Sequence, residues 1–400
     1  MISFEEALQQ IKENGFLLRE ESVPIGAALG RINSRDLRSP LSLPSFNNSA
    51  MDGFAFCSKD TSGATTEKPV FLKIAGAIRA GDEGEPLEKN TTVRIMTGAV
   101  LPHGADTVLE NEKAMIRRGS LRFDGPVPEA RNVRYKGEEI TKGDRVLPKG
   151  ALIHPGIIGF LAAMGMDRVH VYQKPNVSLI GTGNELTEPG FPLRTGKIYD
   201  SNTAMVQAAL DEMKIRPVFV RRVPDEKNAI RNVIRFALGH SDFLILMGGV
   251  SSGDHDHVKE MLKKSGVRTL FWKISQKPGM PLYFGRKNKC LVFGLPGNPA
   301  SVFTCFYEYV YPAIRRAMGH ANPYLAAERM PVEEEIRPDR DRFLFLKGKI
   351  SQNGSRAVLP LKHQRSHMLS SLCETNGLVV VPNSEQPLKK GEKALVHLLP

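Results

Sequence analysis

Three glycine-rich segments each follow a short apolar stretch that the sequence predicts as a buried strand. They are Gly-Thr-Gly-Asn-Glu-Leu at 181–186, Gly-Gly-Val-Ser-Ser-Gly-Asp-His-Asp at 248–256 and Gly-Leu-Pro-Gly-Asn-Pro at 294–299. Glycine lets backbone N–H groups approach a phosphate closely, and Ser or Thr hydroxyls add donors. Ligands of open parallel sheets bind at the carboxyl ends of the strands. The segments therefore favour a phosphate-containing ligand, with these expected contacts: Thr182, Gly183, Gly248, Gly249, Ser251, Gly253, Pro296, Gly297, Asn298 and Pro299.

Carboxylates and lysines accompany these glycines. Glu185, Asp254 and Asp256 are expected at the same sheet edge, where carboxylates and phosphate oxygens together suit Mg²⁺. Lys273 and Lys277 could neutralise the remaining negative charge. A single glycine-rich turn is more often only a tight turn, but three from one sheet favour a ligand.

The third segment also predicts a helix start. Asn298 can act as N-cap with Pro299 at the first helical position, which leaves the following amides for an anion. No segment matches a Walker A or GxGxxG pattern, which disfavours ordinary nucleotide hydrolysis and dinucleotide binding.

The elements around these segments alternate between strand and helix. Strands are expected at 177–180 and 243–247, and the second has five apolar residues without alternation, as in a parallel sheet covered on both faces. A final helix is expected at 301–318. Residues 174–321 are therefore predicted as an α/β domain with a parallel-rich sheet.

The rest of the chain differs in texture. Residues 44–143 are predicted as an inserted β domain, 322–400 as a C-terminal β-barrel-like domain, and 1–43 with 144–173 as an N-terminal helical and linker domain. The fold class is thus α/β plus β, in several domains. Turns are expected at Gly348, Gly354, Gly377 and Gly391 in the C-terminal domain.

Two short helices are expected near the N-terminus. Ser3 and Glu6 form a capping box that opens a helix ending near Asn14. A second helix is expected to begin at Ser22-Val23-Pro24 and to end near Gly30.

Composition narrows the class of protein. Lys and Arg outnumber Asp and Glu by 55 to 43, for a net charge of +12, but no RNA-binding signature or long basic run accompanies this excess. We therefore expect no nucleic acid partner. No segment approaches the roughly 20 apolar residues of a membrane helix, and the N-terminus is acidic where a secretory signal is basic, so a cytoplasmic protein is expected. The four cysteines lie far apart, which predicts free thiols.

Two phrases of the inserted domain, 44–55 and 95–106, are strand-and-loop patterns that identify no function alone. Asp52-Gly53 could be a simple hairpin turn.

Taken in order, these motifs resemble the molybdopterin molybdotransferases, the family of bacterial MoeA and the E domain of gephyrin-like proteins. The likeness runs over nearly the full chain, at the following motifs: Ser49–Ala55, Thr97-Gly98-Ala99, Pro102–Asp106, Asn132–Arg134, Gly137–Glu139, Thr182–Leu186, Gly248–Asp256, Lys277-Pro278-Gly279 and Leu295–Pro299.

The resemblance implies an elongated homodimer whose substrates are molybdate and adenylylated molybdopterin. Molybdate enters the dithiolene, and the phosphoanhydride is cleaved with Mg²⁺ to release AMP. Partners implied are the molybdopterin adenylyltransferase and molybdoenzyme acceptors. The catalytic site would lie in a cleft between the α/β domain and the β domain that holds Asp52, with that β domain supplied by the other subunit of the dimer.

The resemblance also implies roles for particular residues. The catalytic positions are Asp52, Thr97, Glu185, Asp225 and Asp256, of which Glu185 and Asp256 would bind the metal ion. The segment Lys277-Pro278-Gly279 joins Lys273 and the 296–299 turn as binding positions for phosphate or molybdate.

Two positions depart from the family pattern. This chain has Met280 where the family usually has Lys, and Glu139 where it usually has Asp. Two other functions stay open: pterin adenylylation, which needs only the α/β domain, and a gephyrin-like scaffold that has lost catalysis.

Overall fold

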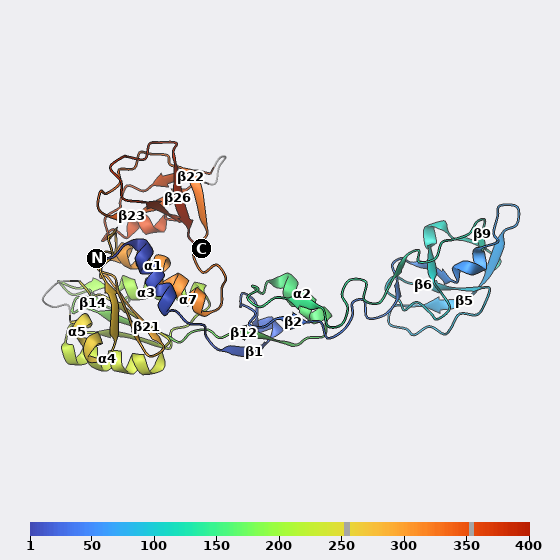
Figure 1. Ribbon diagram of the computed structural model, residues 1–400, viewed down its shortest axis with the longest axis horizontal. Coiled ribbons are helices and arrows are strands. Elements are labelled where there is room, and N and C mark those ends of the chain that lie inside the picture. The colour runs from blue at the N-terminus through green and yellow to red at the C-terminus, as the bar shows by residue number, and fades with distance from the viewer. Residues whose placement is uncertain (252–256, 352–355) are drawn as a thin grey trace. The chain divides into compact units, whose positions relative to one another are not determined.

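The computed structural model describes residues 1–251, 257–351 and 356–400 (Figure 1). The chain folds into two compact units. The first unit comprises Met1–Val23, Gly30–Ser34 and His170–Pro400, and the second comprises Pro24–Leu29 and Arg35–Val169. No helix among the described residues is long and apolar enough to cross a membrane.

A six-stranded sheet forms the centre of the first unit. Its strands in spatial order are β16 (Phe219–Val223), β13 (Val177–Thr182), β17 (Phe243–Met247), β21 (Cys290–Leu295), β20 (Tyr283–Lys287) and β18 (Arg268–Trp272). The first four strands run parallel and the last two pairings are antiparallel. The prediction of a parallel-rich α/β sheet is therefore confirmed.

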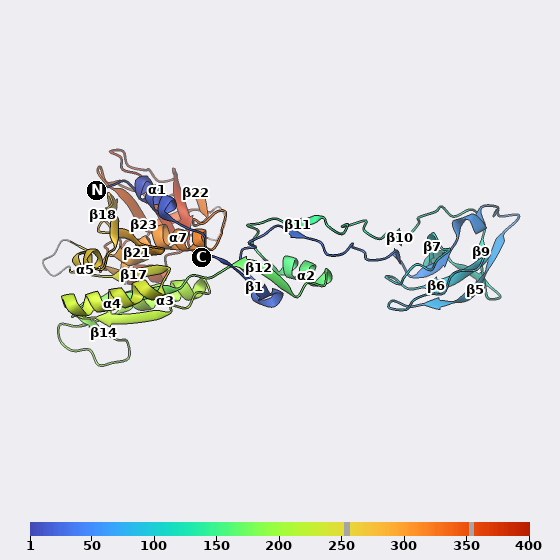
Figure 2. The same ribbon diagram turned by 60° about the horizontal axis from the view of Figure 1, so that its bottom comes forward.

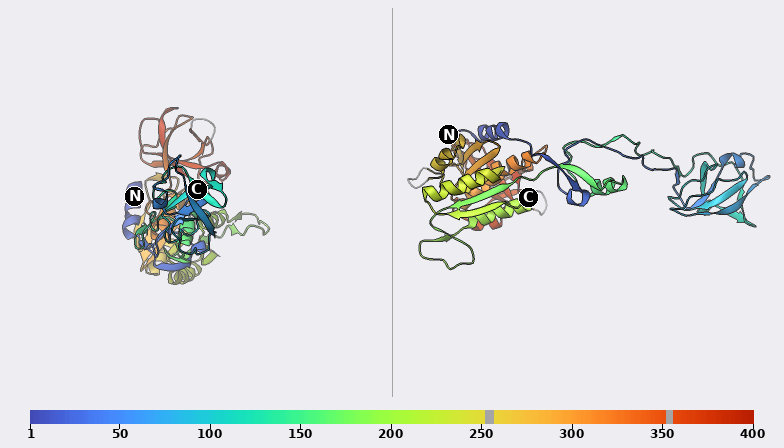
Figure 3. Two further views of the ribbon diagram at one scale, coloured as in Figure 1. Left: turned by 90° about the vertical axis from the view of Figure 1, so that its right-hand side faces the viewer. Right: turned by 90° about the horizontal axis from the view of Figure 1, so that it is seen from below.

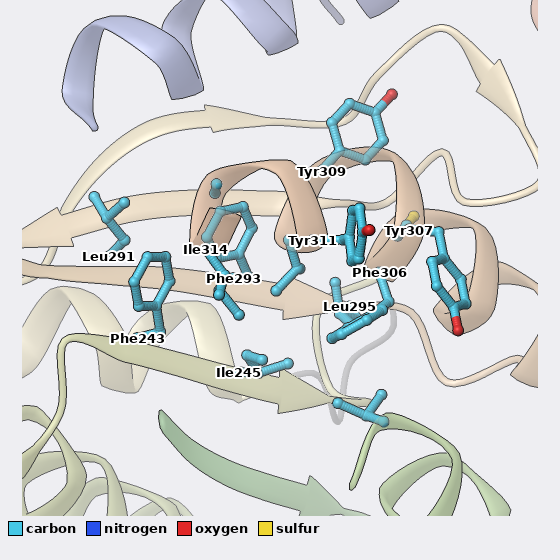
Figure 4. Packing of buried hydrophobic residues seen from close by; sticks show 14 of the residues in the cluster. Phe243, Ile245, Leu291, Phe293, Leu295, Phe306, Tyr307, Tyr309, Tyr311 and Ile314 are labelled. Carbon is cyan, nitrogen blue, oxygen red and sulfur yellow. The ribbon is translucent and has the colours of Figure 1, made fainter. Parts of the chain in front are cut away.

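Helices cover both faces of this sheet. One hydrophobic cluster takes in residues of α1 (Phe4–Asn14), α3 (Ser201–Glu212), α6 (Pro299–Cys305) and α7 (Tyr311–Ala317), and a second takes in residues of α4 (Lys227–His240) and α5 (Val258–Lys264). Figure 4 shows the first cluster, in which the rings of Phe243 and Phe293 lie between the strands and the helices. Every residue of β17 is buried, as its unbroken apolar pattern predicts.

The helix expected at 301–318 is a single helical run with an irregular middle. Five residues, Phe306–Val310, form a π-helix between α6 and α7. This π-helix carries Glu308, which is 4% exposed and accepts a hydrogen bond from Nδ1 of His397 at 2.9 Å. A carboxylate is thus buried beneath the C-terminal strands with a partner.

The first unit also contains the C-terminal sheet. Its strands in order are β19 (Gln276–Lys277), β23 (Phe343–Ile350), β25 (Gly377–Val381), β26 (Lys393–Leu398) and β22 (Ala327–Pro331), with β24 (Val358–Pro360) paired to β23. A 3-10 turn, η5 (Ser370–Cys373), precedes β25. Figure 2 shows this sheet beside α1, and Phe4 of α1 stacks on Phe343 at 4.9 Å between ring centroids.

The turn expected at Gly391 is confirmed, with φ of +87°, and Gly354 lies outside the described residues. The turns expected at Gly348 and Gly377 are wrong, because both glycines lie in strands and face each other across the β23–β25 pair. A Cβ at Gly348 would lie 2.7 Å from Cγ2 of Val358, and one at Gly377 would lie 2.8 Å from Cγ1 of Val396. These glycines make room for neighbouring side chains rather than bend the chain.

The second unit is built on a β-sheet of six strands in the order β7 (Thr107–Glu110), β4 (Gly53–Phe56), β6 (Thr91–Ile95), β5 (Val70–Ile78), β9 (Ser120–Phe123) and β8 (Met115–Arg117). Its other elements include β2 (Leu37–Arg38) paired with β11 (Arg145–Leu147), β3 (Asn48–Ser49) paired with β10 (Val133–Arg134), α2 (Pro155–Ala163), and the 3-10 turns η2 (Ser58–Thr61) and η3 (Asn111–Lys113). The expected β-rich texture is confirmed. The hairpin considered at Asp52-Gly53 is absent, because β3 pairs with β10 whereas β4, which begins at Gly53, pairs with β6 and β7.

The capping box is confirmed, since Ser3 Oγ accepts from the Glu6 amide and Glu6 Oε2 accepts from the Ser3 amide. The prediction of a second N-terminal helix is wrong. Ser22, Val23 and Pro24 lie in β1 (Glu20–Pro24), which pairs with β12 (Arg168–Tyr172), and only the 3-10 turn η1 (Ile25–Ala27) follows. Pro24 has the extended ψ of 143°, which no helix continues.

Candidate functional site

The three glycine-rich segments meet at one cavity of about 770 Å³ in the first unit. Its lining residues come from the carboxyl ends of β13, β17 and β21, from the segment 198–202 and from the C-terminal domain: Thr182, Gly183, Glu185, Leu186, Ile198, Tyr199, Asp200, Ser201, Asn202, Asp225, Met247, Gly248, Gly249, Val250, Ser251, Pro281, Pro296, Gly297, Asn298, Pro299, His367 and Leu369. The expected convergence of the three segments on one sheet edge is therefore confirmed.

Within the first segment, Gly181 and Thr182 still belong to β13, and the turn begins at Gly183. Oγ1 of Thr182 donates to the carbonyl of Met247 at 3.4 Å, which joins the ends of β13 and β17. A Cβ at Gly183 would lie 2.6 Å from the carboxylate oxygens of Glu185. The exposed Glu185 side chain thus folds back over Gly183 at the cavity wall.

A reciprocal pair of hydrogen bonds fixes this turn. The Asn184 amide donates to Oδ2 of Asp225 at 3.2 Å, and the Asp225 amide donates to Oδ1 of Asn184 at 3.1 Å. Nζ of Lys197 donates to the Asn184 carbonyl at 2.5 Å. Asp225 and Glu185 therefore reach the same cavity from two turns that are bonded to each other.

The loop between β14 (Leu186–Thr187) and β15 (Ile198–Tyr199) extends away from the sheet, as Figure 3 shows. The two short strands pair in parallel and return the chain to the cavity at Ile198 and Tyr199.

The second segment has a backbone that only glycine adopts without strain. Gly248 and Gly249 have φ of +93° and +65°. A Cβ at Gly248 would lie 2.6 Å from the Thr182 carbonyl oxygen, and one at Gly249 would lie 2.6 Å from Cγ2 of Val258. Ser251 also lines the cavity, whereas Gly253, Asp254 and Asp256 lie outside the described residues.

The third segment differs from its prediction. Asn298 precedes α6 and Pro299 is the first helical residue, but Nδ2 of Asn298 donates to Oγ of Ser366 at 3.0 Å instead of its side chain capping the helix. The Ala300 amide donates to the Ser366 carbonyl at 3.0 Å, and the Ser301 amide donates to Asn298. The expectation that these amides are left for an anion is wrong, because the C-terminal domain takes the first of them.

Several residues that line the cavity were not predicted from the sequence to belong to the site. Asp200 caps α3 by accepting from the Thr203 amide at 3.0 Å, and Nδ2 of Asn202 donates to the Gly297 carbonyl at 2.7 Å. The run Asp-Ser-Asn before a helix is a cap signal that could have placed this start earlier. His367 and Leu369 have no such signal, since only the packing of the C-terminal domain brings them here.

Four proposed binding residues are absent from the cavity lining formed by the described residues. Nζ of Lys273 lies 4.3 Å from the centroid of the Trp272 ring. Lys277 pairs with Leu344 in the C-terminal sheet, and Pro278 and Gly279 follow it. Pro281 is the cavity residue closest to them in sequence. Their role as ligand contacts stays a prediction.

The two departures from the family pattern lie in different units. The Ile274 amide donates to the Met280 carbonyl at 2.9 Å, directly before the cavity residue Pro281. In the second unit, the Glu139 amide donates to the Leu43 carbonyl at 3.1 Å. Met280 therefore places a neutral side chain next to a cavity residue, and Glu139 carries a carboxyl group.

Asp52 and Thr97 lie together in the second unit. The amide and the hydroxyl of Thr97 both donate to Oδ1 of Asp52 at 2.7 Å. These two bonds, with a smaller contribution from Arg94, lower the pKa of the Asp52 carboxyl. The expected nearness of Thr97 to Asp52 is visible as direct hydrogen bonding.

The four cysteines are free, as predicted. Burial raises the pKa of Cys290 to about 12, and burial also raises the pKa of Cys305. Neither thiol is suited to act as a nucleophile at neutral pH.

Three family models match successive parts of the chain. They describe the MoeA N-terminal region (domain I and II) at residues 2–165, a probable molybdopterin binding domain at 178–316 and the MoeA C-terminal region (domain IV) at 329–399.

Known proteins match over the whole length. The chain is 32% identical to the molybdopterin molybdenumtransferase of Haemophilus influenzae, with 100% of both chains covered, and 32% identical to molybdopterin molybdenumtransferase 2 of Mycobacterium tuberculosis, with 99% of both covered. A crystal structure of the molybdopterin biosynthesis MoeA protein from Pyrococcus horikoshii superposes with a TM-score of 0.88 at 30% identity, over 100% of this chain and 99% of that one. These matches show that the chain belongs to the molybdopterin molybdenumtransferase family, the MoeA proteins.

Proposed function

We propose that this chain is a transferase that inserts molybdenum from molybdate into adenylylated molybdopterin and releases AMP, the final step in forming molybdenum cofactor. Family membership supports molybdenum insertion as the activity. The single observation that carries the finer proposal is the cavity at which three glycine-rich segments meet beside Glu185 and Asp225.

The cavity has the chemistry of an anion site. Its volume of about 770 Å³ suits a ligand the size of an adenylylated pterin. Backbone with positive φ at Gly248 and Gly249 lets a phosphate come close to the main chain, and the Ser251 hydroxyl adds a donor. We assign the phosphoanhydride to this wall of the cavity.

The carboxylates present fit Mg²⁺. Magnesium usually binds one or two carboxylates and completes its shell with water and substrate phosphates. Glu185 lines the cavity, and Asp256, which lies outside the described residues, is the second proposed ligand. The described residues contain no group of three or more His, Cys, Asp or Glu that could hold a metal ion by themselves, so substrate oxygens would complete the site. When bound, Mg²⁺ would stabilise negative charge on the phosphoanhydride oxygens.

The reaction requires no covalent intermediate with the protein. A water oxygen bonds to phosphorus as the bridging P–O bond breaks, which yields AMP and the phosphate of molybdopterin. The sulfur ligands of molybdenum belong to the substrate dithiolene, which is consistent with the elevated thiol pKa values of Cys290 and Cys305. Asp225 holds the turn of Glu185 in place, and Thr97 keeps Asp52 ionised.

Further parts of the proposal rest on the sequence and on the family resemblance. They are a homodimeric active form, a cytoplasmic location, transfer of substrate and product between this protein, the adenylyltransferase and acceptor enzymes, and phosphate or molybdate contacts at Lys273, Lys277, Pro278 and Gly279. The domain boundaries at 43/44, 143/144, 173/174 and 321/322 also stay predictions. Analytical ultracentrifugation tests the dimer directly.

One assay separates the possible activities. Purified protein is mixed with Mg²⁺, molybdate and adenylylated molybdopterin, and AMP and the molybdenum-loaded product are measured. Both products are expected, in proportion. Adenylylated pterin formed from ATP and free molybdopterin would support adenylyltransferase activity instead, and a protein that forms neither product would fit a scaffold.

A further inference from the structure

Trp272, the single tryptophan of the chain, forms a hydrogen bond with the glycine-rich segment 248–251. It is the last residue of β18, an edge strand of the central sheet. Its indole Nε1–H donates to the carbonyl of Val250 at 2.9 Å. Val250 itself lines the cavity, so the indole is bonded to a residue that would contact the proposed ligand.

Val250 is held on its other side by the sheet. It is 1% exposed, and its Cγ1 lies 2.6 Å from the place where a Cβ on Gly294 would stand. Its side chain therefore packs directly against β21. With the side chain fixed on β21 and the carbonyl bonded to Trp272, the peptide that follows Gly249 has its orientation set from two directions.

The indole ring also receives two lysines. Nζ of Lys259, in α5, lies 3.2 Å from the ring centroid, and Nζ of Lys273 lies 4.3 Å from it. Contact of an ammonium group with an indole is attractive, because the ring face carries negative charge density. Val250 precedes residues 252–256 in the sequence, and Lys259 follows them. The Trp272 side chain therefore contacts one residue before that segment and one residue after it.

We propose that Trp272 is a positioning residue for the anionic substrate: it orients the Gly248–Ser251 backbone through Val250 and holds the ammonium groups of Lys259 and Lys273 against its own ring. This inference rests on the proposed function of the cavity. Lys273 does not line the cavity, so the inference adds a role through Trp272 to the ligand contact that the sequence predicts for this residue.

The substitution Trp272→Phe separates the two parts of this arrangement, since it removes the N–H donor but keeps an aromatic face for the lysines. The Val250 carbonyl then loses its indole donor, and the backbone amides of the segment lose their fixed direction. We expect the KM for adenylylated molybdopterin to rise about three- to tenfold, with kcat changed less than about twofold. Trp272→Leu removes both parts, and a larger rise is expected.

Tyr283→Phe is the matched control. It deletes the hydrogen bond between the Tyr283 and Thr269 hydroxyls, which joins β20 and β18 in the same hydrophobic cluster, and it leaves Val250 untouched. Its melting temperature should change about as much as that of Trp272→Phe, whereas its KM should stay at the wild-type value. Equal KM values for Trp272→Phe and the wild type would overturn the inference.

Two measurements on the wild type keep the inference separate from the proposed function. Equilibrium dialysis with labelled adenylylated molybdopterin tests the site itself, and absence of binding would overturn both. Tryptophan emission, corrected for ligand absorbance with free N-acetyltryptophanamide, should shift on saturation with the same ligand. Binding by dialysis without any shift in emission would overturn the role of Trp272 alone. Both measurements use the wild-type protein, so neither depends on whether a Trp272 variant folds.

Discussion

Thr97 donates two hydrogen bonds to one oxygen of Asp52, from its backbone amide and from its hydroxyl, both at 2.7 Å. The bond from the amide lowers the pKa of the Asp52 carboxyl most, followed by the bond from the hydroxyl, while desolvation opposes them. Both donors favour the charged carboxylate. Asp52 therefore stays ionised at a pH where an ordinary aspartate begins to take up a proton.

Thr97→Val removes the hydroxyl donor and leaves the amide. The pKa of Asp52 should rise toward its ordinary value, because one of the two bonds to the carboxylate is lost. If ionised Asp52 serves the reaction, the acidic limb of the pH–rate profile moves to higher pH in this variant. A ¹³C NMR titration of the Asp52 carboxyl measures the shift directly.

Thr91→Val is the control for this change. Thr91, the first residue of β6, donates its hydroxyl to the Glu88 carbonyl, and the structure gives it no hydrogen bond to Asp52. An Asp52 pKa that is the same in Thr97→Val and in Thr91→Val would contradict the assignment of the shift to the Thr97 hydroxyl.

Glu185→Gln should keep the fold and impair AMP release. The side chain is exposed at the cavity wall, so the neutral amide fits the same space. Loss of the charge should lower the rate about 100-fold and raise the Mg²⁺ concentration needed for half-maximal activity. The control is Glu188→Gln, since Glu188 forms an ion pair with Arg222 and does not line the cavity. A normal Mg²⁺ dependence in Glu185→Gln would exclude Glu185 as a metal ligand.

Asp52→Ala and Asp256→Ala should likewise fold normally and stop AMP release from adenylylated molybdopterin with molybdate. Circular dichroism checks the fold, and AMP is quantified by chromatography. Normal turnover in both variants would discard the carboxylate assignment.

Local patterns in the sequence predict the elements that position the cavity. The uninterrupted apolar run of β17, followed at once by Gly248, marks a buried parallel strand and the turn after it. The same reasoning places Thr182 and Pro296 at one sheet edge, because the carboxyl ends of neighbouring parallel strands must lie together.

The rest depends on contacts between residues distant in sequence. Ser366 accepts hydrogen bonds from the Ala300 amide and from the Asn298 side chain. No pattern in the sequence near residue 298 predicts a hydrogen-bond partner 68 positions away. The turns predicted at Gly348 and Gly377 are wrong for the same reason. Alone, each glycine is a turn signal, and only their pairing across two strands shows that they clear space for valines.

Gly249→Ala should weaken both the fold and the binding of substrate. Alanine at φ of +65° is strained, and its Cβ would lie 2.6 Å from Val258. Together these effects should cost about 1–3 kcal/mol of unfolding free energy. Gly297→Ala is the matched control, because Gly297 lines the same cavity and a Cβ there meets nothing within 4 Å. Equal thermal stability of the two variants would refute the strain argument.

His397→Leu should destabilise the first unit strongly at neutral pH. It leaves the buried carboxylate of Glu308 without the imidazole that contacts both of its oxygens, which should cost about 3–5 kcal/mol. Burial already raises the pKa of Glu308, and loss of His397 removes an interaction that lowers it.

The pH dependence of the stability of His397→Leu follows from the direction in which the Glu308 pKa is shifted, which is upward. A raised carboxyl pKa in the folded state contributes stability that is present below the ordinary pKa of Glu and is lost as the pH rises through the folded-state pKa. The melting temperature of His397→Leu should therefore move toward that of the wild type as the pH falls through this window. Adding Glu308→Gln to His397→Leu should abolish this dependence, because the amide that replaces the carboxyl does not titrate. Calorimetry that finds the dependence unchanged in the double variant would contradict the account, and the titrating group would then have to lie elsewhere in the first unit.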